Sequence, residues 1–150
     1  MNQWKIGDVK ITRVIESEAV WDGSMLLPNA TAENVKKERD WLSTFSSEDG
    51  RLKLTIQALI LESQGKRILV DTCIGNDKVR SNPEWNKLKL PFLQDLEKAG
   101  SPRDKIDRVV CTHLHIDHVG WNTMLKNDKW VATFPNAKYL IGGTEWDFFS

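Results

Sequence analysis

Three histidines and an aspartate lie within six residues of this 150-residue chain. They are His113, His115, Asp117 and His118, in the spacing H-x-H-x-D-H, and the chain has no other histidine. Imidazole and carboxylate groups are the ligands that zinc uses at hydrolytic sites, and iron or manganese accept them as well. A single histidine would be interpreted as a solvated or core residue, but four ligand-type side chains this close together predict a metal site.

The order of these four side chains favours two metal ions over one. In a chain that leaves a strand, His113 and His115 point to the same side and can bind one ion together. Asp117 and His118 are adjacent and diverge from that pair, so we expect them to bind a second ion. Gly120 allows the backbone to bend tightly after them. A catalytic zinc ion usually has three protein ligands and a water, so each ion needs at least one further ligand.

Short buried strands are expected to position the motif. Residues 107–112 (DRVVCT) predict a strand, and the motif follows at its carboxyl end. Residues 67–71 (RILVD) predict another buried strand, which ends in Asp71. We interpret Cys111 as a small buried strand residue rather than a thiolate nucleophile, because its neighbours in the strand are apolar.

The rest of the chain predicts strands interleaved with helices, a pattern that is typical of a mixed α/β layer structure. No internal repeat or interdomain linker is visible, so residues 1–150 are interpreted as a single domain. Turn residues, caps and hydrophobic periodicity place the elements. We expect a hairpin over 4–16, a loop over 16–28, a helix from Asn29 or Thr31 to Leu42, a strand over 52–62, a helix over 91–99, a strand over 139–141 and a helix from 143.

Composition argues against several classes of function. The chain has 21 Lys and Arg against 21 Asp and Glu, so its formal net charge is zero. This balance disfavours nucleic acid or an anionic membrane as a partner, since binding to either needs surplus positive charge. The sequence shows neither an apolar run of about 20 residues nor a secretory signal, and its two cysteines make no disulfide framework. We therefore expect a cytoplasmic protein that acts on a small-molecule substrate.

Large apolar side chains outside the motif have two interpretations. Those of the 17–30 loop either line an apolar entrance to the site or pack on the protein's own core or a dimer partner. They are Trp21, Met25, Leu26 and Leu27. Trp121 borders the site by sequence, whereas the other tryptophans are expected to be packing anchors. These anchors are Trp41, Trp85, Trp130 and Trp146.

The motif and its flanks resemble those of the metallo-β-lactamase-fold hydrolases. The resemblance rests on residues 112–122 (THLHIDHVGWN), with support from 68–77 (ILVDTCIGND) and 134–149 (FPNAKYLIGGTEWDFF). It covers most of the chain and is nearest to the lactonase and organophosphate-hydrolase-like branch. It implies an αββα sandwich made of two similar αβ halves, of which only the first is present in this chain.

The resemblance also implies roles for individual residues. His113 and His115 would bind the first zinc ion, and Asp117 and His118 the second. Asp71 would orient a ligand by hydrogen bonding, although a simple turn carboxylate is an equally good interpretation. Asp117 would in addition orient a hydroxide that bridges the two metal ions, which makes it the candidate catalytic residue. That hydroxide would attack an ester, a lactone or a related substrate, with a thioester as the alternative.

The family's remaining ligands would follow downstream, and this sequence ends at Ser150 before them. We therefore expect either the amino-terminal portion of a metal-dependent hydrolase or a catalytically incomplete metal-binding half that needs a partner. Phe148 and Phe149 lie at the very end of the chain. Together with a sheet that lacks its facing layer, they predict exposed apolar surface and association into a homo-oligomer.

Overall fold

The computed structural model describes residues 3–150. The chain divides into two compact units. The sheet unit comprises Met1–Glu16 and Ile56–Ser150, and the small unit comprises Ser17–Thr55.

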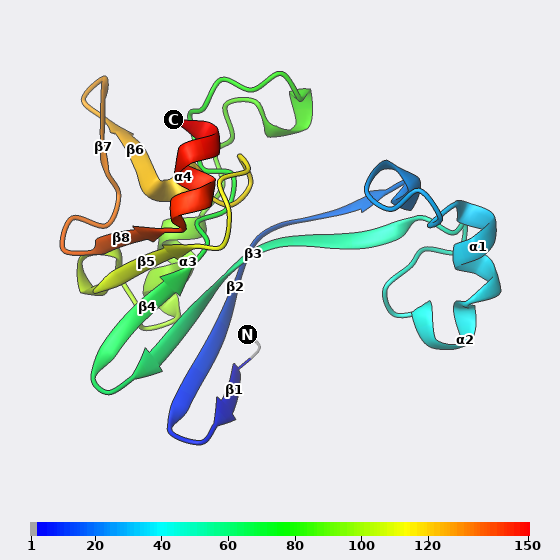
Figure 1. Cartoon of the computed structure of the whole chain (residues 1–150), viewed down its shortest axis with the longest axis horizontal. Helices are drawn as coiled ribbons and strands as arrows, with labels where there is room; N and C mark the ends of the chain where they lie inside the picture. The colour runs from blue at the N-terminus through cyan, green and yellow to red at the C-terminus, as the bar shows by residue number, and fades with distance from the viewer. Residues whose placement is uncertain (1–2) are drawn as a thin grey trace. The chain divides into compact units, whose positions relative to one another are not determined.

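A mixed sheet with the strand order β1-β2-β3-β4-β5-β8 organises the sheet unit (Figure 1). Its strands are β1 (Gln3–Ile6), β2 (Val9–Trp21), β3 (Leu52–Ser63), β4 (Lys66–Val70), β5 (Arg108–Cys111) and β8 (Lys138–Ile141). The end of β2 after Glu16 and the start of β3 before Ile56 belong to the small unit. β1 and β2 are antiparallel, as are β3 and β4, whereas β4, β5 and β8 run parallel to one another. The carboxyl ends of three neighbouring strands therefore lie at one edge, the place where open α/β sheets bind their ligands.

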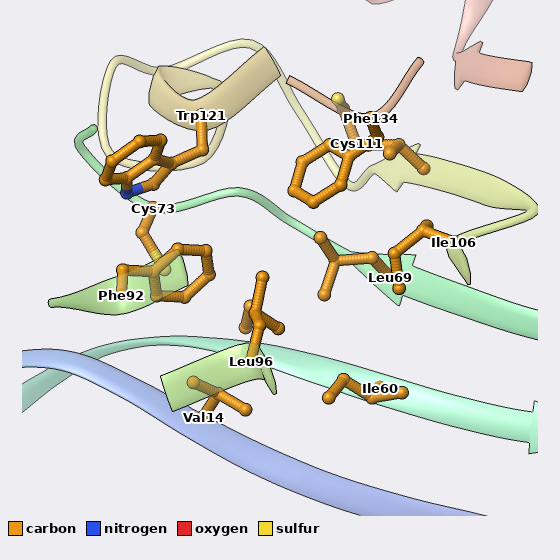
Figure 2. Close-up of a cluster of buried hydrophobic side chains, with 12 residues drawn as sticks. Val14, Ile60, Leu69, Cys73, Phe92, Leu96, Ile106, Cys111, Trp121 and Phe134 are labelled. Carbon is orange, nitrogen blue, oxygen red and sulfur yellow. The ribbon is translucent and has the colours of Figure 1, made fainter. Parts of the chain in front are cut away.

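The hydrophobic core joins this sheet to α3 (Phe92–Lys98). Phe92 and Leu96 lie four residues apart on one face of the helix, and both are fully buried. They cluster with Leu69 of β4 and Val109 of β5, which pair across the sheet. Figure 2 shows this cluster, which also contains Val14, Ile60, Cys73, Ile106, Cys111, Trp121 and Phe134. The predicted helix over 91–99 and the strands at 67–71, 107–112 and 139–141 are thus confirmed to within a residue or two.

Two predictions for the first third of the chain are wrong in part. The expected loop over 16–28 begins late, because β2 continues to Trp21 and alternates between buried and more exposed positions. The helix expected from Asn29 or Thr31 to Leu42 is two short helices, α1 (Ala32–Lys37) and α2 (Arg39–Leu42), which meet at Glu38. Thr31 does cap α1, since its Oγ1 accepts a hydrogen bond from the Asn34 amide at 3.3 Å.

A second, two-stranded sheet was not predicted. It is the hairpin of β6 (Thr123–Lys126) and β7 (Lys129–Ala132). Asn127 and Asp128 form its turn with φ values of 51° and 58°. Two consecutive residues with positive φ are typical of a two-residue hairpin turn, and asparagine and aspartate tolerate that conformation. The remaining elements are α4 (Gly143–Phe149) and the short 3₁₀ turns Gly23–Met25, Pro83–Trp85, Arg103–Lys105 and Gly120–Asn122.

No helix within residues 3–150 combines the length and the apolar character needed to span a bilayer.

The small unit buries little apolar surface of its own. Val35 is buried, and it lines an apolar groove of about 490 Å³ together with Leu27, Trp41 and Leu52. Met25, Leu26 and Leu27 are all more than half exposed, so the interpretation that they pack on the protein's own core is wrong. Trp41, Trp130 and Trp146 are also about half exposed or more, which contradicts their interpretation as packing anchors.

Candidate metal centre

Two loops leave the sheet at the shared carboxyl edge. The aspartate loop, residues 71–77, follows β4, and the histidine loop, residues 112–122, follows β5 and contains the H-x-H-x-D-H motif. The two strands are paired in parallel with Val70 opposite Val110. The loops therefore start side by side and run in the same direction.

Backbone hydrogen bonds join the two loops. The Thr72 amide donates to the His118 carbonyl at 2.7 Å, and the Trp121 amide donates to the Thr72 carbonyl at 2.8 Å. The Gly120 amide donates to the Cys73 carbonyl at 2.7 Å. The loops are therefore joined backbone to backbone, and we expect a shift of the aspartate loop to displace the histidine loop as well.

Gly120 allows the two loops to pack closely, whereas the sequence suggested that it allows a tight bend. Its φ lies outside the left-handed region, but a Cβ at this position would stand 1.8 Å from the carbonyl oxygen of Ile74. Gly75 faces it from the aspartate loop, where a Cβ would stand 2.6 Å from the Gly120 carbonyl carbon. Only two glycines allow the backbones to approach this closely.

Asp71 lies against the histidine loop and orients His118. Its Oδ1 accepts from the Thr112 amide at 2.8 Å, and its Oδ2 faces Nδ1 of His118 at 2.8 Å. A carboxylate can only accept here, so Nδ1 of His118 carries a proton and Nε2 is the ring nitrogen left for a metal ion. This is the tautomer that a metal ligand needs, with the carboxylate behind it.

The same network orients His113. The Thr112 hydroxyl lies 2.8 Å from Oδ2 of Asp71 and 3.1 Å from Nδ1 of His113. A hydroxyl has a single proton, and donating it to the carboxylate leaves the oxygen to accept from Nδ1 of the imidazole. Nε2 of His113 is then the ring nitrogen that faces His115.

The four motif side chains lie close together, with 3.9 Å between the ring centroids of His113 and His118. Two pairs of donor atoms stand out within this group. Nε2 of His113 lies 3.1 Å from Nδ1 of His115, and Nε2 of His118 lies 3.4 Å from Oδ2 of Asp117. Two ligand atoms on one tetrahedral zinc ion stand about 3.3 Å apart, given bond lengths of about 2.0–2.1 Å. The donor set and both spacings therefore fit zinc. Within residues 3–150, however, no group of three or more His, Cys, Asp or Glu side chains is arranged to hold an ion.

The carboxyl-terminal helix α4 also contacts the histidine loop. Oε2 of Glu145 accepts a hydrogen bond from the Leu114 amide at 3.0 Å. The ring of Phe149 meets the His115 imidazole edge to face, with 6.0 Å between centroids. Backbone and ring of the H-x-H segment thus both have a partner on α4.

Sequence reasoning missed Glu16, a buried carboxylate of β2 that is only 8% exposed. It accepts from the amides of Ile74 and Gly75 at 2.8 and 3.1 Å, and from the indole Nε1 of Trp121 at 2.7 Å. Burial raises its pKa, although the three hydrogen bonds act in the opposite direction. One signal was available in the sequence: Glu16 continues the alternation of buried positions begun by Thr12 and Val14.

Neither cysteine is suited to act as a nucleophile. Cys73 and Cys111 are both buried and unpaired, and burial raises the pKa of each thiol. For Cys73, the nearby carboxylates of Glu16, Asp71 and Asp117 raise it further. A raised pKa removes the reactive thiolate at neutral pH. The predicted burial of Cys111 is confirmed.

A family model described as "Metallo-beta-lactamase superfamily" matches residues 53–149, which is more than half of the chain. Both loops and α4 lie inside that match. No curated protein matches the chain.

Solved structures share the fold at low sequence identity. AidC, a dizinc quorum-quenching lactonase in complex with its product N-hexanoyl-L-homoserine, is 22% identical with a TM-score of 0.72, over 98% of this chain and 46% of its own. A probable metal-dependent hydrolase from Staphylococcus aureus is 23% identical with a TM-score of 0.72, over 97% of this chain and 51% of its own. An N-acyl homoserine lactone hydrolase, with its product at the catalytic metal centre, is 18% identical with a TM-score of 0.52, over 88% and 59%.

These likenesses confirm the predicted mixed α/β fold class. The chain spans about half the length of the solved structures that it matches. This agrees with the prediction that one αβ half of a sandwich is present.

Proposed function

Since the chain belongs to the metallo-beta-lactamase superfamily, we propose that its histidine loop provides ligands for two zinc ions in a hydrolase that acts on an ester or lactone. The observation that carries the proposal is the pairing of donor atoms. His113 faces His115, and His118 faces Asp117, at distances that suit two ligands of one ion.

The protons of this site are held where ligation requires them. Asp71 accepts from Nδ1 of His118, and the Thr112 hydroxyl accepts from Nδ1 of His113. Nε2 is therefore the nitrogen of each imidazole that a metal ion would take. Bound zinc supplies a nucleophilic water of lowered pKa and polarises the oxygen of the substrate. Asp117, half-buried beside His118, orients the reacting groups through its carboxylate.

The substrate class is supported by the solved structures of the same fold. Two of them are described as lactonases or lactone hydrolases with product bound, and one of these is described as dizinc. The chain brings no cysteine nucleophile to the site, as the two thiols are buried. Activation of water at metal ions is consistent with this, and it would serve a lactone, an ester or a thioester alike.

One observation favours a second candidate, a metal-binding half that turns over substrate only with a partner. The motif side chains form pairs, whereas a catalytic zinc ion usually has three protein ligands. The partner would then supply the remaining ligands. A second copy of the chain or a separate polypeptide could do so.

The purified chain, assayed with an aryl ester and with a γ-lactone, tests the proposal. We expect hydrolysis that a chelator abolishes, that zinc restores, and that His115→Ala abolishes. Lys126→Ala, on the β6–β7 hairpin outside the motif, is the matched control and should retain activity. Hydrolysis that neither the chelator nor His115→Ala affects would contradict a role for the motif. Zinc binding without turnover would favour the second candidate.

A further inference from the structure

Glu16 carries a carboxyl group among apolar core residues. It lies on β2 beside the core residue Val14 and is almost fully buried. Its partners are neutral N–H groups on the two loops of the candidate metal centre: the amides of Ile74 and Gly75, and the indole of Trp121. Glu16 and Trp121 are 105 positions apart in the sequence. Burial of a carboxyl group costs free energy unless hydrogen bonds compensate for it, and here these three bonds do so.

We propose that Glu16 is a positioning residue that holds the aspartate loop and the histidine loop in the arrangement their metal ligands require. The expected effect on zinc binding rests on the proposed function, whereas the placement of the two loops by Glu16 rests on its hydrogen bonds alone. Glu16 touches none of the four motif side chains. It acts on them through the backbone of Ile74 and Gly75 and through the ring of Trp121.

The first route from Glu16 to the ligands runs through the aspartate loop. Its carboxylate fixes the backbone at Ile74 and Gly75, three and four residues after Asp71. Asp71 in turn orients the imidazole of His118 through Nδ1. A loop that is free to shift at Ile74 would carry Asp71 away from that imidazole.

The second route runs through Trp121, which stands three residues after His118. Its indole Nε1 donates to Glu16, and its ring stacks on Phe92 of α3 with 5.7 Å between centroids. Figure 2 shows this ring at the edge of the core beside Phe92 and Cys73. The polar end and the apolar face of the indole are therefore fixed by different partners, one of which is Glu16.

A carboxylate is the group that suits these three donors. Its two oxygens accept all three N–H groups, with Oε2 on Ile74 and Oε1 on Gly75 and Trp121. The amide of a glutamine has the same shape but only one acceptor oxygen. Its NH₂ group would face a backbone N–H and leave it without a partner, so Glu16→Gln perturbs the loops while changing the packing very little.

Zinc affinity of the full chain, measured by competition with a chromophoric chelator, tests the consequence. We expect Glu16→Gln to weaken zinc binding about tenfold, the lower end of the loss produced by residues that support metal ligands. Val14→Ala is the matched control, because Val14 is buried in the same strand and cluster but hydrogen-bonds neither loop through its side chain. It should lower stability to urea and leave the affinity of the folded protein unchanged.

Amide hydrogen exchange of the metal-free chain tests the geometry separately. We expect Glu16→Gln to speed exchange at the amides that join the loops, which are those of Thr72, Gly120 and Trp121. The effect should exceed that of Val14→Ala when the two variants are compared at the same free energy of unfolding. Faster exchange with unchanged zinc affinity would overturn the link to the ligands. Unchanged exchange would overturn the positioning role itself. If the wild-type chain binds no zinc, the proposed function fails, and the exchange result still decides whether Glu16 positions the loops.

Discussion

The two loops of the candidate metal centre and the small unit are held together in different ways. In the loops, side-chain hydrogen bonds join residues that are far apart in sequence, such as Asp71 with Thr112 and Glu16 with Trp121. In the small unit, the side chains of Asp22, Thr31 and Glu38 bond to residues at most three positions away. The loops also adjoin a fully buried core, whereas the small unit leaves most of its large apolar side chains exposed.

The difference indicates which region has its conformation fixed by the rest of the unit. Hydrogen bonds between distant residues, made by buried groups, fix the conformation of a loop. Pre-organised metal sites need such support. Short-range bonds stabilise turns and caps but do not fix a surface. Within the small unit, the apolar groove that Val35 helps to line stays open, and Leu27 and Trp41 in its walls are exposed.

Truncation of one aromatic ring in each region should give the largest contrast. Phe92→Ala removes a fully buried ring that stacks on Trp121, and we expect it to lower the free energy of unfolding by about 3–5 kcal/mol. Trp41→Ala removes a ring that is 65% exposed, and we expect a loss below about 1 kcal/mol. Urea unfolding followed by far-UV circular dichroism measures both. Equal losses would contradict the contrast between the two regions.

Added volume between the loops should have the next largest effect. Gly120→Ala places a Cβ against the Ile74 carbonyl, so the backbones must separate, at a cost of about 1–3 kcal/mol. Gly143→Ala is the matched control, since a Cβ there meets nothing within 4 Å. Thermal unfolding compares the two variants. A Gly120→Ala protein as stable as the control would mean that the close approach of the loops is not a constraint.

Loss of a cap in the small unit should have a smaller and local effect. Thr31→Ala removes the acceptor of the Asn34 amide at the start of α1, which costs about 1 kcal/mol. We expect faster amide exchange within Ala32–Lys37 and unchanged exchange in β4 and β5. If the strands of the sheet unit lost protection to the same degree, the two regions would be one cooperative structure.

The smallest effect concerns pH. Burial raises the pKa of Glu16 in the folded chain above its usual 4.5, so the folded state binds the proton more tightly than the unfolded state. The stability contribution of this proton is complete below pH 4.5 and is lost as pH rises through the folded pKa. The stability of the wild type relative to Glu16→Gln should therefore fall as pH rises above 4.5, as urea unfolding at several pH values would show. A difference that stays constant would mean that Glu16 titrates normally.

The sequence was sufficient where the relevant residues are close together. The H-x-H-x-D-H spacing predicted that four ligand-type side chains would lie close together, and the apolar runs before Asp71 and His113 predicted their strands. Glu16 was missed because its partners lie 58 to 105 positions away. The β6–β7 hairpin was missed because Asn127-Asp128 is a weaker turn signal than Asn-Gly, and its strands are only four residues long.

The break between α1 and α2 could not be predicted for a related reason. Glu38 is a good helix former, but in the structure it lies at φ −93°, ψ 19°, outside the helical region. The Glu38 carboxylate accepts from the indole of Trp41 at 2.9 Å. Helical periodicity through Val35 and Leu42 is consistent with one helix or two, and the choice depends on such local contacts.

Zinc bound per chain tests the central claim most directly. Equilibrium dialysis followed by elemental analysis would compare the wild type with His115→Ala, His118→Ala and the double variant. We predict up to two zinc ions per wild-type chain, a reduction in each single variant because each removes one donor of a pair, and no specific zinc in the double variant. A wild-type chain that binds no more zinc than the double variant would contradict the claim that these paired side chains form a metal site.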